Sequence, residues 1–325
     1  MPNPKKAIIT TTINPPTKAL LKFADIAKND DWHLFIVGDK KTPHDAYNEM
    51  AALDYVTYIT PEDQEGISQE LSDLIGWNCI QRRNFGLIAA YRWGAEIIAT
   101  IDDDNIPTER WGKNVKVGQE LGISTFKWDL PVFDPMAPAF PSLWHRGFPV
   151  QLLNQRHIKF KPQLKTRRVL VQADLWDGDP DIDAICRIGH SPAVKFNPNL
   201  IHYAGDKPSP FNSQNTFLSR EIIRDYFLFP HIGRMDDIWA AYYVQALHPD
   251  CVAYYKATVF QERNDHDLVK DLKAEMIGYE HTLELIEWLY ETGPKNPEPQ
   301  DWPAFMPREA LDAFVVYQKV IDGDA

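Results

Sequence analysis

The chain begins with an alternation of apolar and amphipathic segments. "KKAIITTTI" (5–13) is a short run rich in β-branched residues, and it predicts a buried strand. The next segment carries Leu20, Leu21, Phe23 and Ile26 at helical spacing behind two prolines. This pattern predicts a helix whose prolines occupy a turn and the first helical position.

The same alternation continues to about residue 105. Apolar runs predict strands at 32–43, 52–60 and 95–105, and apolar residues spaced three and four apart predict a helix at 79–94. Strands that alternate with helices predict an α/β fold, with a mainly parallel sheet covered by helices on both faces. In such sheets ligands bind beyond the carboxyl ends of the strands, so functional residues are expected at that edge.

The rest of the chain has a different pattern. Residues 105–215 are rich in Pro, Trp, Gly and Asp, and they predict loops and short strands that build a substrate pocket over the sheet edge. Periodicity then predicts helices at 219–229, 236–247, 267–290 and 308–321, a strand at 251–261, and a turn-rich linker at 293–303. We therefore expect a main domain at 1–266 and a C-terminal helical extension, 267–325, packed on the same domain.

Charge and cysteine content narrow the function classes. Among 325 residues, 34 Lys and Arg oppose 46 Asp and Glu, so the net charge of -12 argues against a general nucleic-acid surface. Cys79, Cys186 and Cys251 are far apart and odd in number, which suits a reducing compartment. The N-terminus lacks the apolar core of a signal peptide, and no apolar run approaches the roughly 20 residues of a membrane span. We expect a cytoplasmic protein without an integral membrane segment. Peripheral membrane association and a homo-oligomer stay open.

The stretch "ATIDDDN" (99–105) places three aspartates directly after a predicted buried strand. The alternatives are a solvated turn and a divalent cation. Three adjacent carboxylates repel one another without a cation, and Mg²⁺ or Mn²⁺ prefers oxygen ligands. Asp39 ends "LFIVGD" on the same predicted rim. The position at the ligand-binding edge therefore favours a metal site.

A strand that ends in Asp-x-Asp resembles the nucleotide-sugar glycosyltransferases with the GT-A fold. "HRGFPV" (145–150), "NTFLSREII" (215–223) and "GRMDDIWAAY" (233–242) are similar to the reversibly glycosylated polypeptides, which are UDP-arabinopyranose mutases. A closer resemblance is to the glycosyltransferase-like domain of the plant STELLO proteins. It extends over "HRGFP", "DGDPDIDAICRI" (177–188), "SPFNSQNTF" (209–217), "DDIWAAYYVQ" (236–245) and "VFQERNDHD" (259–267). These blocks occur in family order and cover roughly residues 80–280.

The resemblance implies a donor site that holds a nucleotide-diphosphate sugar and Mn²⁺ or Mg²⁺. Asp39 would accept a hydrogen bond from the base, typically uracil N3–H, although a Gly-Asp pair also suits a plain turn. His266 would be a late metal ligand, or else a surface or helix-cap residue. The implied metal ligands are Asp102, Asp104 and His266; the implied nucleotide contacts are Thr11, Asn14, Asp39, Arg82, Arg83, Asp102 and Asp103, with one of the two arginines on the diphosphate.

The resemblance also implies residues for catalysis and for the acceptor. Asp236 and Asp237 precede a predicted helix, where a carboxylate serves as general base or as a simple cap; Asp237 is favoured because it abuts the helix. Arg146 aligns with the arginine implicated in reversible glycosylation in the mutases, but their second arginine, seven residues later, is Leu153 here. The acceptor or sugar site is assigned to Asp179, Asp181, Asn212, Gln214 and Asn215.

These residues together imply a GT-A-like catalytic domain at 1–266. The expected activity is metal-dependent transfer of a sugar from a UDP-sugar or related donor to a glycan or other hydroxyl acceptor, as in polysaccharide biosynthesis. One alternative is a UDP-sugar pyranose/furanose mutase, and a second is a non-catalytic scaffold of the same fold. A metal-dependent phosphatase or nuclease would also use clustered aspartates, but it would leave the ordered blocks unexplained.

Overall fold

The computed structural model describes residues 4–159, 161–190, 193–262, 267–293 and 297–323. The strands are β1 Lys6–Thr12, β2 Trp32–Gly38, β3 Val56–Ile59, β4 Ile97–Ile101, β5 Asn105–Pro107, β6 Glu120–Phe126, β7 Gln163–Arg168, β8 Val171–Gly178, β9 Tyr203–Gly205, β10 Asn215–Ser219 and β11 Val252–Gln261. The α-helices are α1 Lys18–Asn29, α2 His44–Met50, α3 Pro61–Ile67, α4 Gln69–Ile75, α5 Arg83–Trp93, α6 Met136–Ala139, α7 Ala184–Gly189, α8 Asp236–Leu247, α9 Leu268–Glu287 and α10 Arg308–Asp322. Short helical turns are η1 Ile80–Arg82, η2 Val150–Gln155, η3 Arg220–Ile222, η4 Gly233–Met235, η5 Trp288–Thr292 and η6 Pro299–Asp301.

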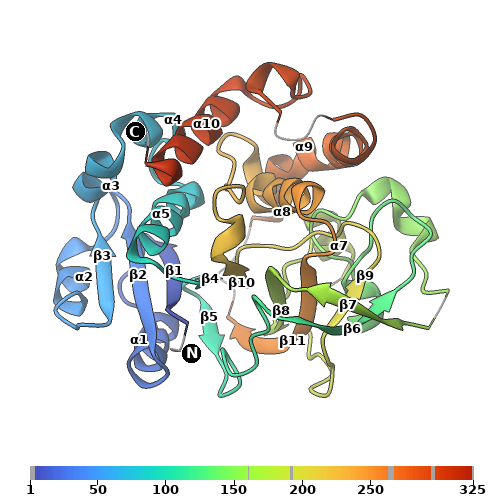
Figure 1. Ribbon diagram of the computed structural model, residues 1–325, viewed down its shortest axis with the longest axis horizontal. Helices are drawn as coiled ribbons and strands as arrows, with labels where there is room; N and C mark the ends of the chain where they lie inside the picture. Colours follow the sequence, from blue (N-terminus) through green and yellow to red (C-terminus); the bar gives the residue numbers. More distant parts are fainter. Residues whose placement is uncertain (1–3, 160, 191–192, 263–266, 294–296, 324–325) are drawn as a thin grey trace.

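One sheet runs through the described residues in the order β3-β2-β1-β4-β10-β8-β11-β9-β6-β7, with β5 paired to β11 (Figure 1). The strands β3, β2, β1 and β4 are parallel. Alternate residues of β1 enter different cores: Ile8 packs in a cluster with Phe23 of α1, and Ile9 in a cluster with Phe85 of α5. Helices therefore cover both faces, and the predicted α/β class is confirmed.

The helix α1 begins at Lys18, two residues later than the prolines indicate. Its N-cap is Thr17, whose Oγ1 accepts a hydrogen bond from Leu20 N at 3.1 Å. The two prolines lie before the cap, so their predicted place at the first helical position is wrong. A threonine hydroxyl satisfies a free N–H at the helix start, which a proline cannot do. Leu20 and Phe23 are fully buried, while Leu21 is 52% exposed and faces away from the core.

The middle of the chain contributes to a cavity at the sheet edge through Arg146, Asp181 and Ser213, and it also supplies strands of the sheet, among them the central strand β8. β10 runs antiparallel to both β4 and β8, and β8 is parallel to β11. The sheet is therefore parallel on the β3–β4 side and mixed beyond it. The buried polar residues Gln172 and Asp174 interrupt the apolar run of β8, which hid this strand from periodicity.

The predicted helix at 219–229 is also wrong. Only η3 is helical there, and Tyr226, Phe227, Leu228 and Phe229 continue as a fully buried irregular segment. A segment that is buried on all sides has no polar face, so its apolar spacing does not reveal its conformation. The predictions for α8, β11, α9 and α10 match the observed elements within a few residues.

The C-terminal helices share the core of the sheet. Helix α10, red in Figure 1, packs against α4 and α5, and α9 packs against η4 and α7. The ring of Phe314 in α10 lies 5.5 Å from that of Phe227 and 5.4 Å from that of Phe229. The boundary at 266 falls beside residues outside the described ranges and stays a prediction. Within the described ranges, none of the helices combines the length and the apolar character required to span a bilayer.

Candidate functional site

The carboxyl ends of β1, β2 and β4 meet at one edge, as the sequence predicts for Asp39 and Asp102. Two cavities open there, and both are lined by Ile80. The first, which we call the threonine cavity, measures about 220 Å³ and is lined by Thr11, Thr12, Asn14, Asp39, Cys79 and Asp103. The second, which we call the acidic cavity, measures about 290 Å³ and is lined by Asp102, Asp104, Arg146, Asp181, Asp236 and Asp237.

The three aspartates of "ATIDDDN" divide between the two cavities. Asp103 faces the threonine cavity, while Asp102 and Asp104 face the acidic cavity. The Oδ2 atom of Asp103 accepts hydrogen bonds from Thr12 Oγ1 at 2.5 Å and from Asn14 Nδ2 at 3.0 Å. The aspartates therefore form a partition between the two cavities, with Asp102 and Asp104 facing the acidic cavity and Asp103 facing the threonine cavity.

Asp102 is held by a buried arginine. Arg83 Nη2 donates to Asp102 Oδ1 at 2.6 Å, and Arg83 Nη1 donates to the carbonyl and hydroxyl oxygens of Ser213 at 2.7 and 2.8 Å. Burial raises the pKa of the Asp102 carboxyl, and the Arg83 guanidinium acts in the opposite direction. Arg83 thus fixes the orientation of a carboxylate in the acidic cavity.

Arg82 points elsewhere. Its Nε donates to Gln64 Oε1 at 2.7 Å and its Nη1 to Ser72 Oγ at 3.0 Å. Its guanidinium carbon stacks 3.6 Å from the ring centroid of Trp77. These contacts tie the start of α5 to α3 and α4. Of the two candidate arginines, Arg83 is the one that contacts residues of the acidic cavity, Asp102 and Ser213.

Asp39 combines the two roles that the sequence left open. Its Oδ1 accepts from Lys40 N at 2.6 Å and its Oδ2 from Cys79 N at 3.2 Å, so it shapes a turn. The same carboxylate lines the threonine cavity. A carboxylate offers about four lone-pair sites, which leaves capacity for a ligand N–H. Thr11, in the same wall, donates its hydroxyl to Val37 O at 3.0 Å.

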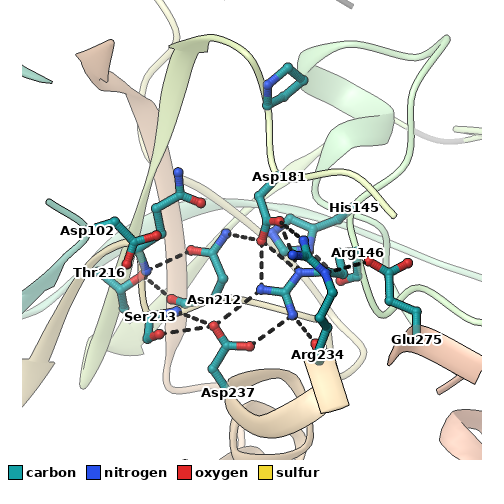
Figure 2. Close-up of polar contacts among 12 residues, drawn as sticks. Asp102, His145, Arg146, Asp181, Asn212, Ser213, Thr216, Arg234, Asp237 and Glu275 are labelled. Carbon is teal, nitrogen blue, oxygen red and sulfur yellow. Dashed lines mark hydrogen bonds and ion pairs between the residues drawn. The ribbon is translucent and has the colours of Figure 1, made fainter. Parts of the chain in front are cut away.

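Arg146 lies at the centre of a buried ion-pair network (Figure 2). Its Nη2 is 2.8 Å from Asp181 Oδ2, and its Nη1 is 3.1 Å from Asp237 Oδ1. Burial alone would lower the pKa of Arg146, but Asp181 and Asp237 outweigh burial and raise that pKa well above its ordinary value. This guanidinium is therefore permanently charged and engaged on two sides.

The two aspartates at the start of α8 have different surroundings. Asp237 binds Arg146 and also accepts from the backbone N and Oγ of Ser213, at 2.8 and 3.0 Å. Asp236 accepts from Gln81 Nε2 at 2.9 Å. Burial, followed by the charge of Asp237, raises the pKa of Asp236 to about 7. The cap residue of the helix is Met235, so neither aspartate is a simple N-cap.

The predicted acceptor residues are only partly brought together. Asp181 and Gln214 line the acidic cavity, and Asn212 Nδ2 donates to Asp181 Oδ2 at 2.8 Å. Asp179 pairs instead with Arg187. Asn215 is the first residue of β10, where its Oδ1 accepts from Trp111 Nε1 at 3.0 Å and its Nδ2 donates to Thr258 Oγ1 at 3.0 Å.

The donor set fits part of a metal site. Asp102 and Asp104 present two carboxylates to one cavity. Within the described ranges, no three or more His, Cys, Asp or Glu side chains are grouped so as to share a metal ion, and His266, the third predicted ligand, lies outside the described residues. Mg²⁺ commonly uses one or two carboxylates together with water and substrate phosphates, so the pair suits such an ion.

Several cavity residues were missed by the sequence analysis. Thr12 was detectable in principle, since it lies near the end of the predicted strand 5–13 at the ligand edge. Gln81 and Arg234 lie in no sequence pattern that indicates a functional site. Only the fold brings Gln81 to the Asp236 carboxylate and Arg234 to the wall of the acidic cavity. Ser213 lies inside the amide-rich block "FNSQNTF", in which only the amide side chains are interpreted as acceptor-site residues from sequence.

Comparisons with known proteins found no family model and no curated protein that matches the chain. Three solved structures are similar at low identity. A crystal structure of a mycobacterial protein has 11% identity and a TM-score of 0.45, covering 90% of this chain and 76% of the other. The mannosyltransferase PcManGT from Pyrobaculum calidifontis, in complex with GDP-Man and Mn²⁺, has 13% identity and a TM-score of 0.42, covering 99% and 74%. S. aureus TarS 1–349, in complex with UDP, has 11% identity and a TM-score of 0.41, covering 99% and 83%. These values are too low to assign an activity to the chain.

Proposed function

We propose that the protein transfers a sugar from a nucleoside diphosphate sugar, with UDP as the nucleotide that the resemblance implies, to a hydroxyl of a glycan or other acceptor. The observation that carries this proposal is the pair of adjoining cavities that share Ile80 at the carboxyl ends of parallel strands. A nucleotide sugar has a nucleoside at one end and a sugar at the other, joined by a diphosphate. It would occupy both cavities and cross the aspartate partition.

The threonine cavity suits the nucleoside. Asp39 and Asp103 present acceptor oxygens, which match the N–H of a base and the hydroxyls of a ribose. Asn14 and Thr12 hold the Asp103 carboxylate in place through the hydrogen bonds described above. Thr11 completes the wall.

The acidic cavity suits the diphosphate and the reacting sugar. Asp102 and Asp104 would hold Mn²⁺ or Mg²⁺ together with the diphosphate, and such an ion, when bound, neutralises the charge of the leaving group. Arg83 keeps the Asp102 carboxylate in its orientation. Five aspartates and two arginines, Arg146 and Arg234, line this cavity, so a cation also offsets its negative charge.

Asp236 is the general base in this proposal. Its carboxylate takes the proton of the acceptor hydroxyl while the acceptor oxygen bonds to the anomeric carbon and the bond from that carbon to the diphosphate breaks. A buried carboxyl with a pKa near neutrality is suited to this role. Asp237 keeps Arg146 and Ser213 in place behind it. Such a tuned group also favours an enzyme over a non-catalytic scaffold.

The surroundings of Arg146 favour transfer over a mutase reaction. Reversible glycosylation of an arginine needs a nitrogen lone pair. The guanidinium here has a raised pKa, is buried, and donates to Asp181 and Asp237. Its proton is therefore held tightly, which makes it a poor nucleophile.

The first test is a calorimetric titration with a panel of nucleoside diphosphates, with and without Mn²⁺. Wild-type protein should bind one nucleotide in a metal-dependent manner, and Asp104→Ala should lose the metal-dependent part. Asp129→Ala, which removes a surface carboxylate paired with Lys159, is the matched control and should bind like wild type. If no diphosphate binds, the donor-site proposal fails. Product analysis with and without an acceptor then separates transfer from interconversion.

A further inference from the structure

Helix α9 packs directly on the turn that carries Asp236. Gly233 to Met235 form η4, and Asp236 follows at once. Gly233 has φ of +61°, and a Cβ there would collide with the carbonyl oxygen of Ala274 in α9. A Cβ at Gly278 of α9 would collide with the side chain of Met235. This close approach is possible only because both positions are glycine.

One buried carboxylate of α9 joins three segments at this contact. Glu275 is 1% exposed. Its Oε1 accepts from Arg234 Nε at 2.8 Å, and its Oε2 accepts from Ala184 N at 2.7 Å and from Tyr279 Oη at 2.5 Å. Burial of a carboxylate is unfavourable unless hydrogen-bond donors and an opposite charge compensate it. Arg234, Ala184 N and Tyr279 provide this compensation, and they fix the position of the Glu275 carboxylate.

Arg234 is held from its other side by the ion-pair network. Its carbonyl oxygen accepts from Arg146 Nη1, and Arg146 is bound to Asp181 and Asp237. Figure 2 shows Glu275, Arg234 and Arg146 in a continuous row that ends at Asp237. The turn before Asp236 is thus fixed by α9 through a side chain and by Arg146 through the backbone.

We propose that Glu275 is a positioning residue: it holds the turn 233–235 and thereby sets the direction of Asp236 in the acidic cavity. The reaction itself rests on the proposed function above. The C-terminal extension is then part of the catalytic apparatus, although Glu275 lines neither of the two cavities described above.

The test compares Glu275→Gln with Thr282→Val as a matched control. Thr282 lies on the same buried face of α9, and its Oγ1 accepts from Trp239 Nε1 of α8 at 3.0 Å. Its replacement removes one hydrogen bond of the α9 interface without touching η4. Tyr279→Phe, which removes one donor to Glu275 and a 3.4 Å contact with Ile185 N, is the milder second variant if Glu275→Gln folds poorly. Glu275→Asp keeps the charge and should restore part of the loss.

Three quantities are measured: amide hydrogen exchange at 233–237, turnover measured as nucleoside diphosphate release, and donor dissociation constant. Glu275→Gln should speed exchange of 233–237 about tenfold and lower turnover roughly 10- to 100-fold, with donor affinity changed by less than about twofold. Thr282→Val should leave both exchange of this segment and turnover at the wild-type level.

The outcomes separate the two proposals. Equal exchange at 233–237 in the two variants, or faster exchange with unchanged turnover, overturns the role of Glu275. Wild-type protein that binds no nucleoside diphosphate overturns the proposed function instead; the exchange of 233–237 then still decides whether Glu275 holds the turn.

Discussion

At the scale of single residues, Asp236 and Asp237 of "MDDIW" show that two adjacent, identical side chains can have different hydrogen-bond partners. Asp237 is saturated by Arg146 and Ser213, while Asp236 has one amide donor, Gln81, and a raised pKa. The sequence analysis favoured Asp237 as the base because it abuts the helix. The partners that distinguish the two carboxylates come from segments more than 20 residues away in the chain, so local sequence carries no information about them.

This difference predicts a pH profile. A general base works only when deprotonated, so turnover at saturating substrate should rise as the pH increases through the Asp236 pKa of about 7. Asp236→Asn should lower turnover by roughly 10²- to 10⁴-fold and abolish that rise. The measurement is the rate of nucleoside diphosphate release across this pH range. Asp179→Asn, outside the acidic-cavity lining, is the control; a wild-type profile in Asp236→Asn would exclude this aspartate as the base.

At the scale of elements, strands with buried charged or amide side chains are harder to predict from the sequence than strands without them. β1, β2 and β4 consist mostly of apolar and β-branched residues, and they match predicted strands. β8 carries Asp174, whose carboxylate accepts from Gln172 Nε2 and Thr258 Oγ1, both at 2.8 Å. Because of its polar residues, the hydrophobic pattern of β8 resembles that of a loop. The hydrogen bonds that compensate the burial of Asp174 come partly from another strand, β11, and the local pattern does not reveal them.

The titration of Asp174 in β8 should make the free energy of unfolding depend on pH. Burial raises the pKa of Asp174 to about 7, well above its unfolded value, so the folded state binds a proton that the unfolded state releases. The stability contributed by this group is present at low pH and declines as the pH rises from about 4 to about 7. Asp174→Asn cannot titrate and should flatten this part of the stability curve. Urea denaturation at several pH values measures it; unchanged pH dependence in the variant would contradict the assignment.

At the scale of the whole molecule, the C-terminal helices share a hydrophobic core with the sheet, and we expect them to unfold together with it. Phe314 of α10 contacts Phe227, Phe229 and Tyr243, which lie in the segments before and after the turn 233–235. One core cluster includes residues of β1, α5, α8 and α10. Helix α9 adds the specific contact through Glu275. The extension is therefore expected to stabilise the site as well as cover the core.

A core substitution tests this cooperativity. Phe314→Ala should lower the free energy of unfolding by about 3–5 kcal/mol, because it removes a buried ring and leaves a cavity. The denaturation curve should stay a single transition, observed equally by tryptophan fluorescence and by circular dichroism. Leu21→Ala, at a half-exposed position of α1, should change the free energy far less. Two separate transitions in Phe314→Ala would mean that the extension folds independently.

The sequence by itself determined the α/β class, the strands β1 to β4 and β11, the helices α1, α5, α8, α9 and α10, and the edge where the aspartates gather, because these features follow from local periodicity and from the common direction of parallel strands. Motifs at predicted strand ends indicated Thr11, Asn14, Asp39 and the three aspartates 102–104, whereas Arg146, Asp181, Gln214, Asp236 and Asp237 were indicated by the family resemblance. Only the tertiary structure decided that Arg83 rather than Arg82 pairs with Asp102, that burial raises the pKa of Asp236, and that Glu275 reaches the turn before Asp236. Each of these depends on contacts between distant segments, whose burial and charge set the chemistry of a side chain and are not encoded near it in the chain.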